Sequence, residues 1–314
     1  MFKFELRELS SSRRHRLDVT SQSVQKVTEQ PFGRLFLSLS PITERLELSC
    51  QKRVDDMFVT TAGRTTQEMI IEAKKIAEHL QVPYLPRKKR SINLIQQQAD
   101  SGCIVVGKEQ LELFERNSVE PFFFHPNSAM FRIKRLINGE YDPYADAAKL
   151  TKGMTVLDCT LGLASDAIVA SFLVGRQGRV IGLEGEKYLA YLVKRGLKTW
   201  ESGIPFMDDA MSRIHVIDKE ALSFLREQED ESVDCVYFDP MFEEKILESN
   251  GIKALGHIAI HDNLTHEIIN EAIRVAKLRV VLKDHFKSLR FEKYGFQVLR
   301  RKTAKFHFGV IEKN

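Results

Sequence analysis

The sequence is poor in cysteine, contains no long apolar run and shows no strong excess of either charge. Its four cysteines, at positions 50, 103, 159 and 235, form no C-x-x-C pair and are too widely spaced for a disulfide framework or a zinc site. No apolar run approaches the roughly 18 residues of a membrane span, and charged residues interrupt the N-terminus throughout. We therefore expect a cytoplasmic protein in a reducing compartment, with no metal and no membrane partner.

The overall composition is that of a globular protein. The chain of 314 residues is 43% hydrophobic and 29% charged, a composition that excludes a protein disordered along its whole length. At about 150 residues per domain, this length allows about two domains. The 47 basic and 43 acidic side chains leave a net charge of +4, too small for a protein that wraps nucleic acid but compatible with local basic patches.

The first half of the chain divides into an extension and a small domain. Residues 1–56 show no sustained helical or strand period, so we interpret them as a weakly specified extension. Residues 57–150 are predicted to form a small α+β domain, in which Thr65 and Glu68 make a capping box before an apolar helical stripe over 69–80. This domain is also predicted to contain strands at 103–106 and 121–124 and a second helix over 129–137.

From residue 151 to 314 the pattern becomes a regular alternation of apolar strands and amphipathic helices. Such alternation is typical of a parallel sheet covered by helices on both faces, so we predict an α/β domain. The last two strand-like runs are too close together for a helical crossover and are expected to pair antiparallel. The predicted strands cover 154–160, 179–185, 213–218, 233–239, 279–284, 296–301 and 304–311.

Ligands of such sheets bind beyond the carboxyl ends of the strands, so the residues after each strand are the candidates for a site. The loop after the first strand has a single glycine, Gly162, instead of the G-x-G-x-x-G of dinucleotide-binding proteins. Asp158 and Asp166 place negative charge where two phosphates would lie, which disfavours NAD. These carboxylates suit a cofactor that has positive centres and no phosphate, such as S-adenosylmethionine with its sulfonium and ammonium.

Acidic residues also end the next two strands. Glu184 lies 22 residues after Gly162, the spacing at which a carboxylate accepts hydrogen bonds from both hydroxyls of an adenosine ribose. Asp218 ends the third strand and can reach an adenine edge. Either residue could instead cap the helix that follows it, but acids on three successive strands favour a cofactor site.

The fourth strand ends in Asp239, Pro240, Met241 and Phe242, which is the most specific signal in the chain. The lone pair of an exocyclic base amine is delocalised into the ring, so its N–H groups need acceptors that pull the nitrogen toward tetrahedral geometry. The Asp239 carboxylate and the Pro240 carbonyl can be these acceptors, because the fixed φ of proline directs its carbonyl. Phe242 can stack on the base. The alternative interpretation is an Asp-Pro turn followed by a buried phenylalanine.

The segments VLDCTLGLASDA, DCVYFDPMFEEK and RVVLKDH together resemble class I S-adenosylmethionine-dependent methyltransferases. Within that class the sequence is most similar to the bacterial 16S ribosomal RNA guanine N2-methyltransferases, the RsmJ-like proteins, from about residue 57 to the C-terminus. The resemblance implies a Rossmann-like, seven-stranded mixed sheet with the last strand antiparallel. It also implies cofactor contacts at Ser165 and Asp166, at Glu184, near Asp218 and at Asp239. The chain departs from the family at Ser165, where the family commonly has arginine.

Basic residues of the first domain could contact RNA phosphates. The candidates are Arg87, Lys88, Lys89 and Arg90, together with Arg132 and Arg135. A run of cations can equally be a solvated loop. The sequence therefore favours a methyltransferase that modifies a guanine N2 of 16S ribosomal RNA, with the ribosomal RNA or the small ribosomal subunit as partner. A small-molecule methyltransferase and a catalytically silent RNA-binding relative are the alternatives.

Overall fold

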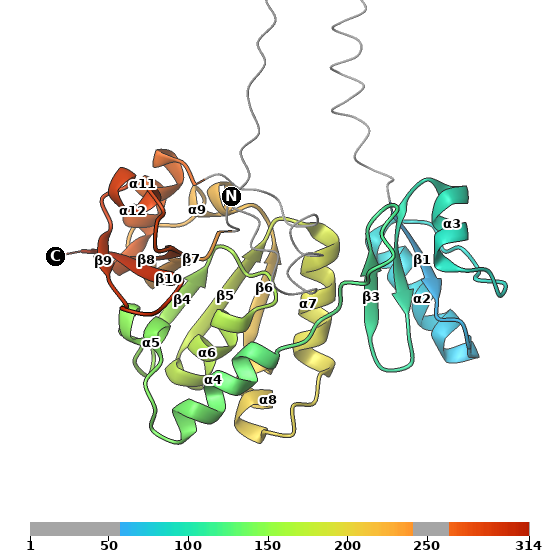
Figure 1. The fold of residues 1–314 in the computed structure, drawn as a ribbon, viewed down its shortest axis with the longest axis horizontal. Coiled ribbons are helices and arrows are strands. Elements are labelled where there is room, and N and C mark those ends of the chain that lie inside the picture. Colours follow the sequence, from blue (N-terminus) through green and yellow to red (C-terminus); the bar gives the residue numbers. More distant parts are fainter. Residues whose placement is uncertain (1–56, 241–263, 314) are drawn as a thin grey trace, which may run out of the picture. The chain divides into compact units, whose positions relative to one another are not determined.

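The computed structural model describes residues 57–240 and 264–313, which form two β-sheets with their helices (Figure 1). The expected extension 1–56 and the base-stacking candidate Phe242 lie outside the described residues. No helix within these two ranges is long and apolar enough to cross a membrane.

The smaller sheet is built from three strands in the order β1 (Met57–Thr61), β2 (Gly102–Val106) and β3 (Leu111–Phe114). β2 pairs parallel with β1 and antiparallel with β3. All five residues of β2 are buried, because α2 (Gln67–Leu80) and α3 (Ile92–Ala99) pack their apolar sides against opposite faces of this sheet.

Three details of this region differ from the sequence-based expectation. The N-cap of α2 is Thr66, whose hydroxyl accepts a hydrogen bond from Met69 N, and Thr65 instead donates to Ala62 O. The predicted strand at 121–124 is wrong, because only Phe122 forms a bridge, with Leu113 of β3. The sequence reasoning also missed β1, β3 and α3, which are short and whose patterns are less regular than that of α2.

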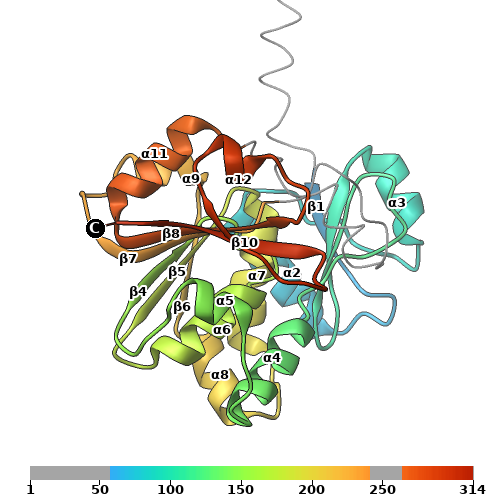
Figure 2. The ribbon, with the colours of Figure 1, turned by 60° about the vertical axis from the view of Figure 1, so that its left-hand side comes forward.

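The larger sheet has the strand order β6-β5-β4-β7-β8-β10-β9 and confirms the predicted mixed, seven-stranded architecture (Figures 1 and 2). β4 to β8 are parallel, and β10 runs antiparallel to both of its neighbours. The strand order reverses at β4, which is where ligands bind in open α/β sheets. The strands are β4 (Thr155–Asp158), β5 (Arg179–Glu184), β6 (Ile214–Asp218), β7 (Val233–Phe238), β8 (Ala276–His285), β9 (Gln297–Leu299) and β10 (Phe306–Glu312).

Alternate residues of these strands pack into two separate cores, as the period of a strand requires. Val156, Cys235 and Tyr237 pack with one group of helices, whereas Leu157 and Phe238 pack with the other. The first group is α4 (Asn127–Ile137), α5 (Pro143–Ala147), α6 (Ser165–Val174), α7 (Lys187–Thr199) and α8 (Pro205–Ser212). The second group, on the opposite face in Figure 2, is α9 (Ala221–Leu225), α11 (His266–Val275) and α12 (Arg290–Lys293).

Candidate active site

The acidic residues predicted from the sequence meet at the carboxyl edge of the larger sheet. Asp158 ends β4, Glu184 ends β5 and Asp239 directly follows β7. In the register of the sheet, Glu184 pairs with Asp218 at the end of β6, and Asp158 pairs with Tyr237 in β7. The topology therefore gathers four acidic residues that are far apart in the sequence at one edge of the sheet: Asp158, Glu184, Asp218 and Asp239.

Hydrogen bonds link the loop after β4 to the end of β7. Asp158 is buried, and its Oδ1 accepts a hydrogen bond of 3.0 Å from Thr160 N. Thr160 Oγ1 in turn accepts a hydrogen bond of 2.6 Å from the backbone N–H of Asp239. Thr160 thus fixes the backbone from which the Asp239 side chain and the Pro240 carbonyl project.

Glu184 closes the next strand and supports the same loop. Its Oε2 accepts from Gly162 N at 3.2 Å, and its Oε1 accepts from Glu186 N at 3.1 Å. Gly162 has φ +47°, a left-handed conformation that glycine adopts without strain. An ionised carboxylate has about four lone-pair sites, so Glu184 can both hold this loop and accept from a ligand hydroxyl.

A network of buried charges lies behind this edge. Lys283 of β8 places its Nζ 2.5 Å from Asp239 Oδ2 and 3.2 Å from Asp166 Oδ2. Asp166 also accepts from Tyr237 OH at 2.9 Å and from Arg132 Nη1 at 2.5 Å. Arg132 binds Asp142 as well, through two hydrogen bonds of 2.7 and 2.9 Å. The network therefore joins α4 and α6 to the ends of β7 and β8.

The members of this network differ in protonation. Burial raises the pKa of Asp158 to about 8, so it is largely protonated at neutral pH. Burial also raises the pKa of Asp239 to about 6, although the charge of Lys283 acts in the opposite direction. Burial alone would raise the pKa of Asp166, but the charges of Lys283 and Arg132 outweigh it and hold this pKa well below its usual range. Of the aspartates that pair with Arg132 or Lys283, Asp239 has the most exposed side chain.

The charge balance of the site favours a cationic ligand. Two cations, Arg132 and Lys283, face three carboxylates, those of Asp142, Asp166 and Asp239. Asp158 adds a fourth negative charge when it ionises. A positive centre near this edge would be attracted, whereas a phosphate would be repelled. The residues present therefore fit a sulfonium and ammonium cofactor.

The other predicted site residues, two cofactor contacts and one acceptor for the base amine, lie in different settings. Ser165 is the first residue of α6 and is partly exposed. Asp218 is exposed. Its pKa is raised by partial desolvation, and the charges of Lys187 and Lys194 from α7 act in the opposite direction. Pro240 is buried directly after Asp239.

The basic residues expected to contact RNA have mostly intramolecular partners. Arg132 belongs to the buried network, and Arg135 pairs with Glu140 at 2.7 Å. Arg87 donates to Thr61 O and Arg90 O, and Arg90 donates to Pro86 O, so these guanidiniums hold their own loop together. Lys88 and Lys89 are exposed, whereas Arg87 and Arg90 are half-buried.

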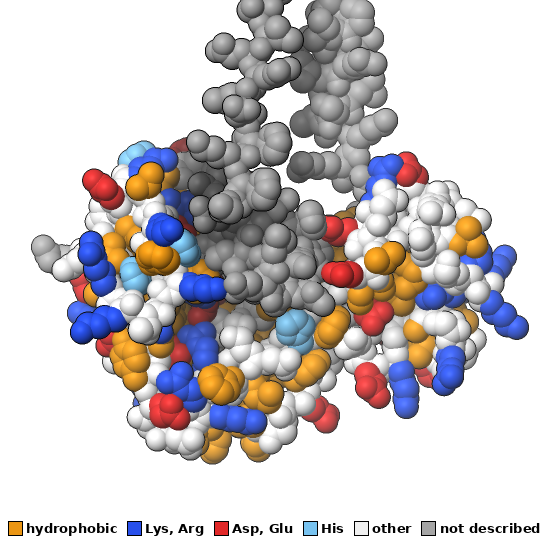
Figure 3. All heavy atoms as spheres, in the orientation of Figure 1, with side chains coloured by type: hydrophobic (Ala, Val, Ile, Leu, Met, Phe, Trp, Pro, Cys, Tyr) orange, Lys and Arg blue, Asp and Glu red, His pale blue; other side chains and the backbone are white. Residues whose placement is uncertain are grey.

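Lysine, arginine and histidine side chains instead gather over β8, β10 and α12, at the left of the face shown in Figure 3. Sequence reasoning did not single out this region.

Sequence reasoning also missed Lys283, Tyr237 and Thr160 as members of the site. A lysine inside the apolar run RVVLKD is the signal that could have identified Lys283, because an inward cation in a central strand requires an anionic partner.

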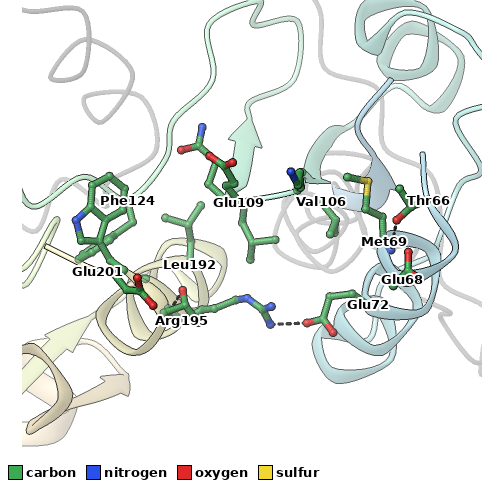
Figure 4. Close-up of a pocket in the computed structure, with 17 residues that line it drawn as sticks. Thr66, Glu68, Met69, Glu72, Val106, Glu109, Phe124, Leu192, Arg195 and Glu201 are labelled. Atoms are coloured by element: carbon green, nitrogen blue, oxygen red, sulfur yellow. Dashed lines mark hydrogen bonds and ion pairs between the residues drawn. The ribbon is translucent and has the colours of Figure 1, made fainter. Parts of the chain in front are cut away.

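A cavity away from these strand ends lies between the smaller sheet's elements and α7 (Figure 4). It has a volume of about 960 Å³ and is lined by α2, the turn between β2 and β3, and α7. An ion pair of 2.5 Å between Arg195 and Glu72 lies in its wall, and Glu68, Glu109 and Glu201 add further carboxylates. None of the acidic residues at the strand ends of the larger sheet lines this cavity.

Comparisons with known proteins agree with this geometry. Residues 87–307 match the family model described as "Putative SAM-dependent methyltransferase". The protein YpiP of Bacillus subtilis, described as uncharacterized, is 48% identical over 256 residues, which cover 81% of this chain and 99% of that protein. The ribosomal RNA small subunit methyltransferase J of Legionella pneumophila is 31% identical over 194 residues, covering 60% of this chain and 75% of that protein.

A solved structure shows the same fold. The SAM-dependent methyltransferase NGO1261 from Neisseria gonorrhoeae superposes with a TM-score of 0.53. The alignment covers 81% of this chain and 95% of that one, at 18% sequence identity. At this identity the likeness concerns the fold alone.

Proposed function

The chain belongs to the SAM-dependent methyltransferase family, and from this premise we propose that its methyl acceptor is an exocyclic base amine in ribosomal RNA, the guanine N2 of 16S RNA. Its cofactor is S-adenosylmethionine, which supplies an activated methyl group on a sulfonium. The observation that carries the proposal is the Asp239-Pro240 pair at the end of β7, held by Thr160 and Lys283.

The loop and strand ends described above would hold the cofactor. Glu184 would accept hydrogen bonds from the ribose hydroxyls, since its carboxylate is buried at the end of β5 and oriented by two backbone N–H groups. Asp158 and the loop up to Gly162 would lie against the positive part of the cofactor. Asp166 would act from behind and not by direct contact, because both of its oxygens already accept hydrogen bonds from Arg132, Lys283 and Tyr237.

Asp239 would bind the amine that is methylated. Its side chain is 24% exposed, and one of its oxygens is engaged by Lys283. The other oxygen, Oδ1, can accept an N–H of the amine, and the Pro240 carbonyl can accept the second. These two hydrogen bonds would localise the nitrogen lone pair, so most of the rate acceleration would come from orientation. After transfer, the additional proton of the amine would pass to the Asp239 carboxylate.

Similarity in sequence supports RNA as the substrate. The Legionella relative is named as a ribosomal RNA small subunit methyltransferase. Guanine is the base methylated by the family that the D-P-M-F segment resembles. A base in folded RNA would have to be extruded to reach an amine acceptor at the end of a strand.

Methyl transfer from isotopically labelled S-adenosylmethionine tests the proposal. The purified protein would be incubated separately with naked ribosomal RNA, with small ribosomal subunits and with a metabolite extract, and Asp239→Ala would serve as the control. Label in RNA or in subunits that is lost in Asp239→Ala supports the proposal. Label only in metabolites would identify a small-molecule methyltransferase, and RNA binding without any transfer would indicate a silent relative.

A further inference from the structure

We propose that a single-stranded segment of the RNA substrate binds a cationic and aromatic surface formed by His285, Phe286, Lys287, Arg300, Arg301 and Lys302. We call this the β8–β10 surface. The inference rests on the proposed function, because it assigns the place where that substrate is bound outside the reaction site.

The β8–β10 surface is far more basic than the rest of the chain. Residues 283–307 contain eight lysines and arginines and only two carboxylates, whereas the whole chain has a net charge of +4. Lys287, Arg300, Arg301 and Lys302 are exposed, and none of them pairs with a carboxylate within 57–240 or 264–313. Exposed cations without partners are available to phosphates, unlike Arg87, Arg90 and Arg132.

Aromatic rings lie among these cations. The Phe286 side chain is 47% exposed, and its ring centroid is 4.6 Å from that of His285 and 6.1 Å from that of His307. Lys287 Nζ lies 5.5 Å from the centroid of the Phe286 ring. Exposed rings beside cations are typical of surfaces that stack bases and bind the backbone of single-stranded nucleic acid.

The topology places this surface next to the reaction site. Lys283 and His285 are two residues apart in β8, so they project from the same face of the sheet, with a separation along the strand of about 7 Å. His285 pairs with Phe306 of β10, and Phe286 N donates to Lys305 O at 3.0 Å. The turn that carries Arg300 to Lys302 is therefore tied to the end of β8. Since Lys283 contacts Asp239, nucleotides flanking a base held at Asp239 would lie over the β8–β10 surface.

Two matched double variants test this assignment. Arg300→Gln/Lys302→Gln removes two exposed cations from the β8–β10 surface, and Lys88→Gln/Lys89→Gln removes two exposed cations from the smaller sheet's connection between α2 and α3. Binding of a fluorescent single-stranded ribosomal RNA fragment would be measured by anisotropy at several salt concentrations. S-adenosylmethionine affinity and Tm would be recorded for each variant.

We expect the Arg300/Lys302 variant to bind RNA more weakly and with less dependence on salt. Each lost phosphate contact lowers the slope of log affinity against log salt by about 0.7 for single strands, so two contacts make the change between roughly 50 and 200 mM salt about sevenfold smaller. Phe286→Ala should raise the Kd at least about fivefold at any salt concentration, because stacking is lost. The Lys88/Lys89 variant should bind RNA as the wild type does, and all three should retain cofactor affinity.

The outcomes separate this inference from the proposed function. If RNA is methylated but the Arg300/Lys302 variant binds and methylates it like the wild type, the β8–β10 surface is wrong and the proposed function stands. If only metabolites are methylated, the proposed function fails, and RNA as the occupant fails with it. Binding to vesicles containing phosphatidylglycerol, lost in the same variant while RNA binding is unchanged, would overturn the RNA assignment in favour of a membrane surface.

Discussion

The Nζ of Lys283 lies 2.5 Å from Asp239 Oδ2 and 3.2 Å from Asp166 Oδ2, so one ammonium joins the buried carboxylate of Asp166 to the partly exposed carboxylate of Asp239. Asp166 has further cationic support from Arg132, whereas Lys283 is the only cation paired with Asp239 among the described residues. We infer that Lys283 orients the Asp239 carboxylate and keeps it ionised.

Replacing Lys283 with methionine should therefore alter both activity and its pH dependence. Without the ammonium the pKa of Asp239 rises above its value of about 6, so the acid limb of the kcat profile moves to higher pH. Because Lys283 also pairs with the buried Asp166, its removal costs up to about 3 to 5 kcal/mol of stability. The Lys283→Arg variant keeps the charge and should keep the acid limb near its original position. An unchanged pH profile in Lys283→Met would rule out this role.

Asp239 variants test the acceptor role separately from folding. Asp239→Ala should abolish methyl transfer while leaving the fold and much of the cofactor affinity intact, because Thr160 binds the backbone at this position and not the side chain. Asp239→Asn should retain part of the activity, since its amide oxygen still accepts a hydrogen bond. Single-turnover transfer rates and calorimetric cofactor binding would check both variants. Full activity in Asp239→Ala would remove this residue from the reaction.

Asp158 should make the cofactor-free protein less stable as the pH rises. Its folded pKa of about 8 lies above the value of about 3.9 expected for an unfolded chain, so stability present in acid is lost between about pH 4 and 8. Asp158→Asn cannot ionise, so its Tm relative to wild type should increase from pH 5 to pH 8.

Asp142→Asn is a control, because its effect on Tm should change with pH in the opposite direction to that of Asp158→Asn. Burial raises the pKa of Asp142, but the hydrogen bonds and charge of Arg132 outweigh it, and the net pKa is lowered. Its ionised form therefore stabilises the fold above about pH 4, and the substitution should lower Tm more at pH 7 than near pH 3. A constant Tm difference between Asp158→Asn and wild type across the pH range would contradict the burial argument.

Glu184 should contribute directly to cofactor affinity. Glu184→Ala should weaken S-adenosylmethionine binding by about 1 to 3 kcal/mol, through the loss of charge-assisted hydrogen bonds to the ribose. Glu184→Gln keeps one acceptor oxygen, which can serve either Gly162 N or a ribose hydroxyl, and should have an intermediate affinity. Isothermal calorimetry with S-adenosylmethionine and with its demethylated product would compare the variants. Undiminished affinity in Glu184→Ala would place the ribose elsewhere.

Strand periodicity and strand-end acids could be read from the sequence because both are local. The apolar runs predicted all seven strands of the larger sheet, and the antiparallel pairing of β9 with β10 follows from their short connection. Asp158, Glu184 and Asp239 could be found because each directly follows a strand or ends one.

The charge network could not be predicted, because it depends on contacts between distant residues. Arg132 lies on the polar side of α4 and suggested a phosphate contact, but the packing of α4 on α6 brings its guanidinium to Asp166, 34 residues away. Lys283 and Asp239 are separated by 44 residues and meet only because β7 and β8 are neighbours. The β8–β10 surface likewise depends on the pairing of His285 with Phe306.

Nucleoside mass spectrometry of RNA methylated in vitro tests the central claim most directly. Small ribosomal subunits and naked 16S RNA would be treated with the enzyme and deuterated S-adenosylmethionine, with Asp239→Ala as the control, and then digested to nucleosides. The account predicts a deuterated methyl group on guanine N2 that is absent from the control. Label on adenine N6 would keep the exocyclic-amine mechanism and discard guanine. Label on a ring nitrogen or a ribose oxygen would contradict the proposed role of Asp239 and Pro240.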